Sequence, residues 1–406
     1  MKRYGMAVAA LWLAACGARG SAQSTFGDDV GFVKGHAGVV LLRRGEAAVA
    51  VVPGYQCRVM TSTAAGDGGT SFGWVNRDLI ASGKLQPHIN PFGGEDRFWL
   101  GPEGGQYGLF FKPGAPFDLE HWQTPAPIDT EAYDVVKTTD DSIICRKKVR
   151  LVNYANTTFD LDVKREVDLR DAAAVVRGFG TTLPAGVNAV AYSTTNTIQN
   201  TGRSAWTRSK GLLSIWILGM YNATPKAMIV VPYKRGDAAV LGDVAHDSYF
   251  GKVPANRLKD DDGVLFFRAD ANLRSKIGVP PRRATNTLGS YDPETRTLTI
   301  VQFTLPGNTA SYVNSMWEIQ RQPYGGDVVN AYNDGPPSPG APQLGRFYEL
   351  ETSSPALALR PGESATHVVT TVHLQGRPEE LDGIAVAVLG RGLEKITGAF
   401  RTQSLP

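Results

Sequence analysis

Eleven residues, "FDLDVKREVDL" (159–169), decide the fold class of this 406-residue chain. Phe159, Leu161, Val163, Val167 and Leu169 are apolar, and charged residues stand between them. Side chains alternate between the two faces of a β-strand, so a period of two over eleven residues predicts a strand with one buried and one wet face. Such strands are typical of antiparallel sheets.

The rest of the chain repeats this signal. Short runs rich in Val, Ile, Thr and aromatic residues are separated by turn clusters, and the sequence holds 45 glycines and 25 prolines. No segment recurs at a fixed period of 20–50 residues, which argues against a propeller or solenoid. We therefore predict an all-β fold, one large antiparallel β-sandwich over residues 31–406 with few short helices. The best helix lies in "RPEELDGIAVAVLGRG", with Pro378 in its first turn and Gly390 or Gly392 at its end.

The N-terminus has the features of a bacterial secretory signal. "MKRYGMAVAALWLAACG" combines a basic start, a short apolar run and Leu13-Ala14-Ala15-Cys16, which resembles a lipobox. We predict a lipoprotein-type signal peptide over residues 1–15, lipid on Cys16 and a flexible tether over residues 16–30. Ordinary cleavage near Ala22 is the alternative. The expected location is the bacterial cell envelope, as an outer-membrane lipoprotein facing the periplasm or the cell surface, or as a protein secreted to the periplasm.

The charge balance gives little indication of a charged partner. There are 42 basic against 39 acidic residues, and loss of the signal brings the net charge to about +1. The one basic run, "RKKVR" (146–150), is interpreted as an exposed strand face with Val149 turned inward. We expect no nucleic-acid partner, and membrane contact only through the lipid anchor.

Two cysteines remain if Cys16 carries lipid. An oxidising compartment favours a disulfide between Cys57 and Cys145, and two separately buried thiols are the alternative. Neither has a nearby cysteine partner of the kind that structural zinc requires. We expect no metal and no cofactor.

A glycine-rich stretch, "GGEDRFWLGPEGGQYGLFF", suggests a binding face. On a strand, Glu95, Arg97 and Trp99 would share one side, while Phe98 and Leu100 would face the core. A carboxylate, a guanidinium and an indole together suit the hydroxyls and the C–H face of a sugar. A surface ion pair beside a half-buried tryptophan is the alternative interpretation.

Nearby residues extend this polar and aromatic region. Glu103 follows the proline that ends the strand, and "DLEHW" adds His121 and Trp122 about twenty residues further on. Glycines on both sides of the strand permit a bulge or a close backbone approach.

A second candidate region lies near the C-terminus. On a strand, Glu349 and Glu351 share a face, and a turn at residues 360–362 leads to a partner strand that carries His367 and His373. Two acids spaced this way are usually solvated, but here they precede a predicted hairpin with two of the six histidines.

Both regions resemble one known superfamily. "FYELETSSPALALRPGESATH" (347–367) and "FGGEDRFWLGPEGG" (92–105) are similar to motifs of the galactose-mutarotase-like supersandwich proteins, which include aldose-epimerase-related members. The resemblance implies a large antiparallel β-supersandwich. It also implies that Glu351, within a Leu-Glu-Thr tripeptide, is the general base and that Arg97 orients the substrate.

The general acid is not assigned by this resemblance. The family has a central Asn-His followed by an aromatic pair, whereas "AHDSYFG" places His246 one residue too far from Tyr249 and Phe250. One inserted residue on a strand reverses its facing. His121 and His246 are both candidates, and we prefer His121 because it lies near the first motif.

These inferences converge on a carbohydrate-processing protein of the cell envelope that acts at an anomeric centre by acid/base chemistry. A glycoside hydrolase, which needs two carboxyls roughly 5–9.5 Å apart, and a lyase with a Tyr or His base remain open. The alternative is a non-catalytic glycan-binding lipoprotein, and an envelope structural protein is a weaker third. The cleft is expected between residues 95–122 and 347–373, with substrate contacts from Glu95, Arg97, Trp99, Glu103, Trp122, Glu349 and His367.

Overall fold

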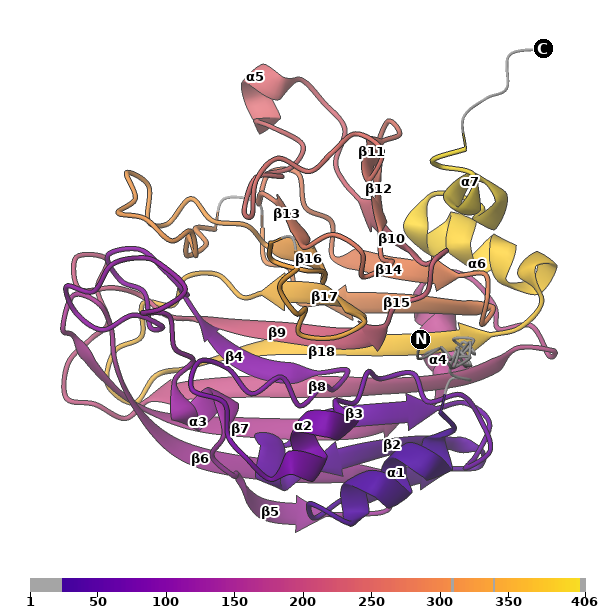
Figure 1. The fold of residues 1–406 in the computed structure, drawn as a ribbon, viewed down its shortest axis with the longest axis horizontal. Coiled ribbons are helices and arrows are strands. Elements are labelled where there is room, and N and C mark those ends of the chain that lie inside the picture. The colour runs from indigo at the N-terminus through magenta and orange to yellow at the C-terminus, as the bar shows by residue number, and fades with distance from the viewer. Residues whose placement is uncertain (1–23, 308–309, 339, 402–406) are drawn as a thin grey trace, which may run out of the picture.

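The computed structural model describes residues 24–307, 310–338 and 340–401 (Figure 1). The expected signal peptide, Cys16 and the first part of the expected tether lie outside these residues. Strands dominate the described chain, and its helices are few and short, so the predicted all-β class is confirmed. No described helix has the length and apolar character needed to span a bilayer.

A ten-stranded antiparallel sheet forms the base of the molecule (Figure 1). In spatial order its strands are β11 (Leu258–Asp260), β12 (Val264–Arg268), β10 (Met228–Pro232), β14 (Thr287–Asp292), β15 (Thr297–Phe303), β18 (Ser364–Gln375), β8 (Asn188–Asn200), β7 (Thr158–Arg170), β6 (Ser142–Val152) and β5 (Asp134–Thr138).

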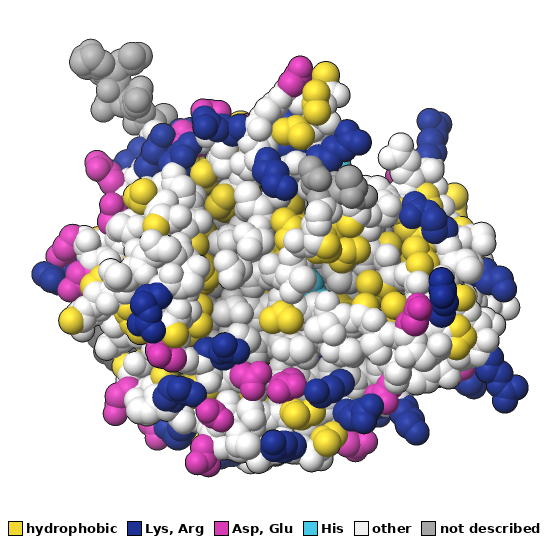
Figure 2. Space-filling model, turned by 180° about the vertical axis from the view of Figure 1, so that it is seen from behind, with side chains coloured by type: hydrophobic (Ala, Val, Ile, Leu, Met, Phe, Trp, Pro, Cys, Tyr) yellow, Lys and Arg dark blue, Asp and Glu magenta, His cyan; other side chains and the backbone are white. Residues whose placement is uncertain are grey.

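Strand β7 contains the stretch that predicted the fold class. Its burial alternates residue by residue from Phe159 to Leu169, as the period of two predicted. The basic run on the neighbouring β6 also behaves as expected, with Val149 buried and Arg146 and Arg150 exposed. These two arginines pair with acids of β7, and acidic and basic side chains are interspersed over the face that Figure 2 shows.

A five-stranded sheet packs on the large one. Its order is β13 (Ser275–Val279), β16 (Val329–Asn333), β17 (Phe347–Ser353), β9 (Ser214–Asn222) and β4 (Arg97–Gly101). Alternate apolar residues of both sheets, such as Phe98, Leu350 and Val163, form one continuous core between them. The opposite face of the small sheet is therefore free to carry other side chains.

The predicted hairpin near the C-terminus is wrong. Strand β17 belongs to the small sheet and pairs with β9 and β16, whereas β18 belongs to the large sheet and pairs with β8 and β15. The turn at residues 360–362 thus carries the chain from one sheet to the other. As a result, the histidines of β18 lie across the core from β17 and not beside its glutamates.

Three helices cover part of the outer face of the large sheet. The predicted C-terminal helix is α6 (Pro378–Leu389), which ends at Gly390 with a φ of 75°. Together with α7 (Leu393–Thr397) and α4 (Ala172–Gly178), it buries a second apolar core against the sheet (Figure 1).

The N-terminal part is a small layer of its own. Strands β1 (Val40–Arg44), β2 (Ala47–Val52) and β3 (Arg58–Thr63) form a three-stranded sheet, and α1 (Phe26–Lys34) and α2 (Arg77–Ser82) lie beside it. The expected tether is therefore wrong for residues 26–30, because Phe26 and Val30 are buried in an apolar cluster with that sheet. The remaining short helices are η1 (Pro53–Tyr55), α3 (Ala126–Asp129) and α5 (Ala238–Leu241).

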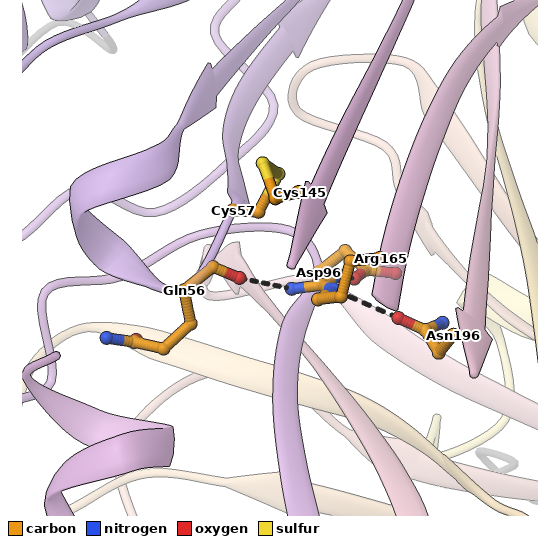
Figure 3. The surroundings of a disulfide bond; sticks show 6 residues. All are labelled: Gln56, Cys57, Asp96, Cys145, Arg165 and Asn196. Carbon is orange, nitrogen blue, oxygen red and sulfur yellow. Dashed lines mark hydrogen bonds and ion pairs between the residues drawn. A yellow bond between two sulfur atoms is a disulfide. The ribbon is translucent and has the colours of Figure 1, made fainter. Parts of the chain in front are cut away.

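A disulfide joins the small N-terminal layer to the large sheet. Cys57, just before β3, is bonded to Cys145 of β6 (Figure 3). Beside it, the guanidinium of Arg165 donates to the backbone oxygen of Gln56 and to Asn196, and forms an ion pair with Asp96. The structure therefore contradicts the alternative of two free thiols.

Candidate functional site

A cavity of about 250 Å³ lies against the outer face of the five-stranded sheet. Its base consists of side chains that pairing between strands places on that face, Trp216 of β9, Lys276 of β13 and Asn330 of β16. Drug-sized ligands occupy roughly 300–1,000 Å³, so this volume suits one small ring.

One wall of the cavity is a hydrogen-bonded set of proton-carrying groups. The Tyr249 hydroxyl donates to Asp327, whose carboxylate also accepts from Nδ1 of His246 at 2.9 Å. Asn330 donates to the Tyr249 oxygen at 3.3 Å. The hydrogen bond that His246 donates to Asp327 raises the pKa of His246, and burial raises the pKa of Tyr249 well above its usual value.

The segment that carries this wall docks on the edge of the small sheet. Residue His246 exchanges two backbone hydrogen bonds of 2.8 Å with Gly278 of β13. The chain then turns so that Tyr249 enters the cavity and Phe250 remains 41% exposed at its edge. Arg274 stacks on Phe250, with its guanidinium carbon 3.9 Å from the ring centroid.

The opposite wall is formed by the glycine-rich loop after β4. The backbone N–H of Glu103 donates to the Ser315 hydroxyl at 3.1 Å, and Trp317 lines the cavity beside it. A Cβ on Gly104 would lie 2.6 Å from the Met316 backbone oxygen, so the close approach of these two loops requires glycine. This is the kind of role that the flanking glycines suggested.

The Glu103 carboxyl has the electrostatics of an acid catalyst. Burial raises its pKa, while the charge of Lys276 and a hydrogen bond with Trp317 oppose that shift. A carboxyl that holds its proton to higher pH is suited to donate it to a substrate oxygen. The cavity therefore has Asp327 with Tyr249 on one side and Glu103 on the other.

Glu351 lies beneath the cavity and does not line it. Its Oε2 accepts from Lys276 Nζ at 2.8 Å and from the Trp216 indole N–H at 3.0 Å, and the residue is fully buried. Its Oε1 has no hydrogen-bond partner within the described part of the chain. The structure therefore places the expected base behind the residues that contact the cavity.

Arg97 shares a face with Trp99, and Glu349 with Glu351, as the alternation in each strand predicted, and pairing through β9 puts all four on the same face of the small sheet. They are nevertheless buried, with Arg97 donating to Glu349 at 2.7 Å and its guanidinium carbon 4.2 Å from the Trp99 ring. Burial raises the pKa of Glu349 to about 8, against the opposing charge of Arg97. Loops cover this part of the face, so the expected accessible surface is wrong for Arg97, Trp99 and Glu349.

Glu95 and His367 lie between the two sheets. Glu95 is not part of β4 and accepts hydrogen bonds from Ser62 and Tyr192, and from His373 Nε2 at 2.8 Å. His367 contacts the Thr352 hydroxyl at 2.9 Å, and burial lowers its pKa to about 3. Neither residue lines the cavity, because both side chains lie in the core between the two sheets.

We define the inter-sheet cluster as Glu95, Asp96, Arg165, His367 and His373. Glu95 and Asp96 are adjacent in the sequence and contact His373 and Arg165, respectively. Asn196 contacts both Arg165 and the His367 backbone oxygen. Next to His373 there is room of about 20 Å³, enough for a water molecule but not for a sugar.

The two expected histidines are placed very differently. His121 lies on a surface loop, where Nδ1 contacts Asp118 at 2.7 Å, whereas His246 contacts Asp327, a residue of the cavity wall. Neither histidine itself lines the cavity. The preference for His121 therefore finds no support in the geometry. Trp122 is buried against Trp317 beside the cavity.

Sequence reasoning missed Lys276, Asp327, Asn330 and Trp317. Two of them had a weak signal, since Lys276 is a charged residue inside the otherwise apolar "SKIGV" and Asp327 follows two glycines. Pairing of β13 with β16 brings Lys276 beside the segment of Asp327 and Asn330, and no local motif marks it. No three His, Cys, Asp or Glu side chains among residues 24–307, 310–338 and 340–401 are grouped to hold a metal ion.

Comparison with known protein families places the chain in a family. The model of a family of unknown function, DUF6786, matches residues 24–400. No curated protein matches the chain.

Three solved structures are similar in fold. A candidate aldose 1-epimerase from Escherichia coli K12 has 12% identity, covers 84% of this chain and 99% of its own, and gives a TM-score of 0.49. The Slr1438 protein of Synechocystis sp. PCC 6803 has 13% identity over 83% and 96%, with a TM-score of 0.48. A galactose mutarotase-like protein from Lactobacillus casei ATCC 334 has 11% identity over 83% and 100%, with a TM-score of 0.47. At such identities the likeness concerns the fold alone.

Proposed function

This chain belongs to the DUF6786 family, and we propose that it catalyses acid/base chemistry on a single sugar ring at its anomeric centre. The observation that carries the proposal is the cavity of about 250 Å³ with Asp327 and Tyr249 on one side and Glu103 on the other. The fold of the solved relatives, whose names include aldose 1-epimerase and galactose mutarotase-like protein, is compatible with it.

Proton transfer between the two walls accounts for ring opening. Tyr249 takes the proton of the anomeric hydroxyl as it passes its own to Asp327, while protonated Glu103 gives a proton to the ring oxygen. The bond between the ring oxygen and the anomeric carbon breaks, and reversal on the other face of the carbonyl closes the ring as the second anomer. Each positioned acid or base contributes about 10² to 10⁴-fold.

The other residues orient the ring and the charges. Trp317 and Phe250 offer flat apolar surfaces to the C–H face of a sugar, and the lining residues Ser353 and Asn330 offer polar side chains to its hydroxyls. Glu351 has a positioning role in this proposal, because its ion pair fixes the ammonium of Lys276 beside Glu103.

Anomer exchange measured by NMR across common aldoses tests the proposal. Wild-type protein is expected to accelerate exchange of at least one sugar, and Asp327→Asn, Tyr249→Phe and Glu103→Gln are each expected to lose about 100-fold or more. His121→Gln, on the surface loop, is the control and is expected to keep full activity.

The outcomes separate this function from its alternative. Saturation-transfer NMR that shows sugar binding without accelerated exchange by the wild type would identify a glycan-binding protein and reject the enzyme. Absence of both binding and exchange over the whole panel would reject the carbohydrate function itself.

We also propose that the protein acts in the bacterial cell envelope, anchored through Cys16. The lipobox-like N-terminus and the disulfide between Cys57 and Cys145, which suits an oxidising compartment, support this location. Metabolic labelling with a fatty acid is expected to mark the wild type and not Cys16→Ser. Equal labelling of the two would contradict the anchor.

A further inference from the structure

A second cavity, of about 630 Å³, adjoins the first. Two residues, Leu119 and Arg274, line both cavities, so the two spaces share a wall. The second space is more than twice as large as the first and lies between helix α2, the loop around Pro87 and the loop around Leu344.

The lining of the second cavity combines exposed apolar side chains with neutral polar groups. Leu119 and Leu344 are 51% and 44% exposed, although both are large aliphatic residues. Between them, Asn76, Gln86 and Gln343 bring amide groups to the same surface. Side-chain amides next to flat apolar contacts match the alternating hydroxyls and C–H faces of a sugar chain.

The charges of the lining argue for a neutral ligand. Arg274 is the one Lys or Arg side chain among the described residues that line this cavity, and it is stacked on Phe250. Of the two acids, Asp334 is already satisfied by the Tyr332 hydroxyl at 2.7 Å and the Gly345 N–H at 2.8 Å, and the exposed Asp78 adds a negative charge that disfavours an anionic ligand. A lining with so little free positive charge is not built for anionic chains.

We propose that the second cavity binds the following units of a neutral oligosaccharide whose reducing-end sugar occupies the first cavity. This inference rests on the proposed function, because chemistry at a free anomeric centre requires the reducing end beside Tyr249 and Glu103. The rest of the chain then leaves the first cavity past Leu119 and Arg274. The natural substrate class is therefore a short neutral glycan and not a free monosaccharide.

The test compares ligands of increasing length. Calorimetric affinities and anomer-exchange rates are measured for neutral gluco-, galacto-, manno- and xylo-oligosaccharides of one to four units. For the preferred series, the trisaccharide is expected to bind about tenfold more tightly than the monosaccharide. Leu344→Ala is expected to reduce the trisaccharide affinity by about fivefold and to leave the monosaccharide affinity unchanged.

Leu85→Ala is the matched control, since this leucine is 65% exposed and lines neither cavity. Equal affinities for one and three units, or equal effects of the two leucine variants, would overturn the inference and leave the proposed function standing. Length-dependent binding without anomer exchange would support the second cavity and reject the reaction. No binding by any series would overturn both.

Discussion

Two buried polar regions of this protein contain the same kinds of side chain and differ in what lies next to them. The inter-sheet cluster holds its carboxylates, Arg165 and imidazoles between two sheets, with space beside it for a water at most. The cavity cluster, which we define as Glu103, Tyr249, Lys276, Asp327 and Glu351, surrounds or supports a space that fits a sugar ring. In the proposed function, ionisable residues therefore act only where a ligand has room to reach them.

The largest expected effect concerns the ion pair of Arg165 and Asp96. Arg165→Met leaves a buried carboxylate unpaired, so the free energy of unfolding should fall by about 3–5 kcal/mol in urea titrations. Arg146→Met, on the adjacent strand, breaks an exposed pair with Asp162 and should cost about 0–1 kcal/mol. Equal losses in the two variants would contradict the assignment of Arg165 to a buried structural cluster.

Removal of the disulfide should have the next largest effect. The bond closes a sequence separation of 88 residues, and Cys57→Ser with Cys145→Ser should lower the free energy of unfolding by about 2–4 kcal/mol. Reduction of the wild type with dithiothreitol should give the same midpoint as the double variant. Sugar binding at 25 °C should persist in both, because the bond lies beside the inter-sheet cluster. A loss of binding without unfolding would link the two regions.

His367 gives the inter-sheet cluster a pH signature. Its pKa is lowered to about 3 by burial, so the stability it provides is complete above the pKa of the unfolded chain, near 6.5, and is lost as the pH falls toward 3. Between pH 6.5 and 4.5 the loss should be about 2–3 kcal/mol. Thermal unfolding across this range should be flatter for His367→Gln, and an unchanged slope would contradict this role.

The smallest effect on stability is expected in the cavity cluster. Glu103→Gln keeps the size and shape of the side chain, and burial raises the pKa of Glu103, so loss of its carboxyl should change the free energy of unfolding by less than about 1 kcal/mol. The same variant is the one expected to lose catalysis. A large destabilisation would move Glu103 from the functional region to the structural one.

The sequence predicted strands and their faces better than it predicted their partners. Period two in residues 159–169 and 97–100 depends on neighbouring residues, and both alternations appear in the structure. The pairing of β17 depends on β9, more than 120 residues away, and no local pattern states it. The sequence therefore predicted a hairpin between the strand of Glu349 and Glu351 and the strand of the two histidines, and the structure does not contain it.

The candidate site shows the same limit. Lys276 comes from one short segment and Asp327 and Asn330 from another, and each looks ordinary in its own stretch of sequence. One local exception did carry information, because Arg165 stands in "FDLDVKREVDL" where the alternation calls for an apolar residue. A charged residue at a position where the alternation places buried side chains predicts a buried partner of opposite charge, here Asp96.

The segment around Tyr249 is expected to detach before the rest of the protein unfolds on heating. It meets the sheet edge through the two backbone hydrogen bonds at Gly278, and most of residues 242–252 are exposed or half-buried, so its local stability is low compared with the strands it rests on. Warming should detach this segment before the sheets melt. Catalytic activity is therefore expected to disappear several degrees below the calorimetric midpoint and to return on cooling.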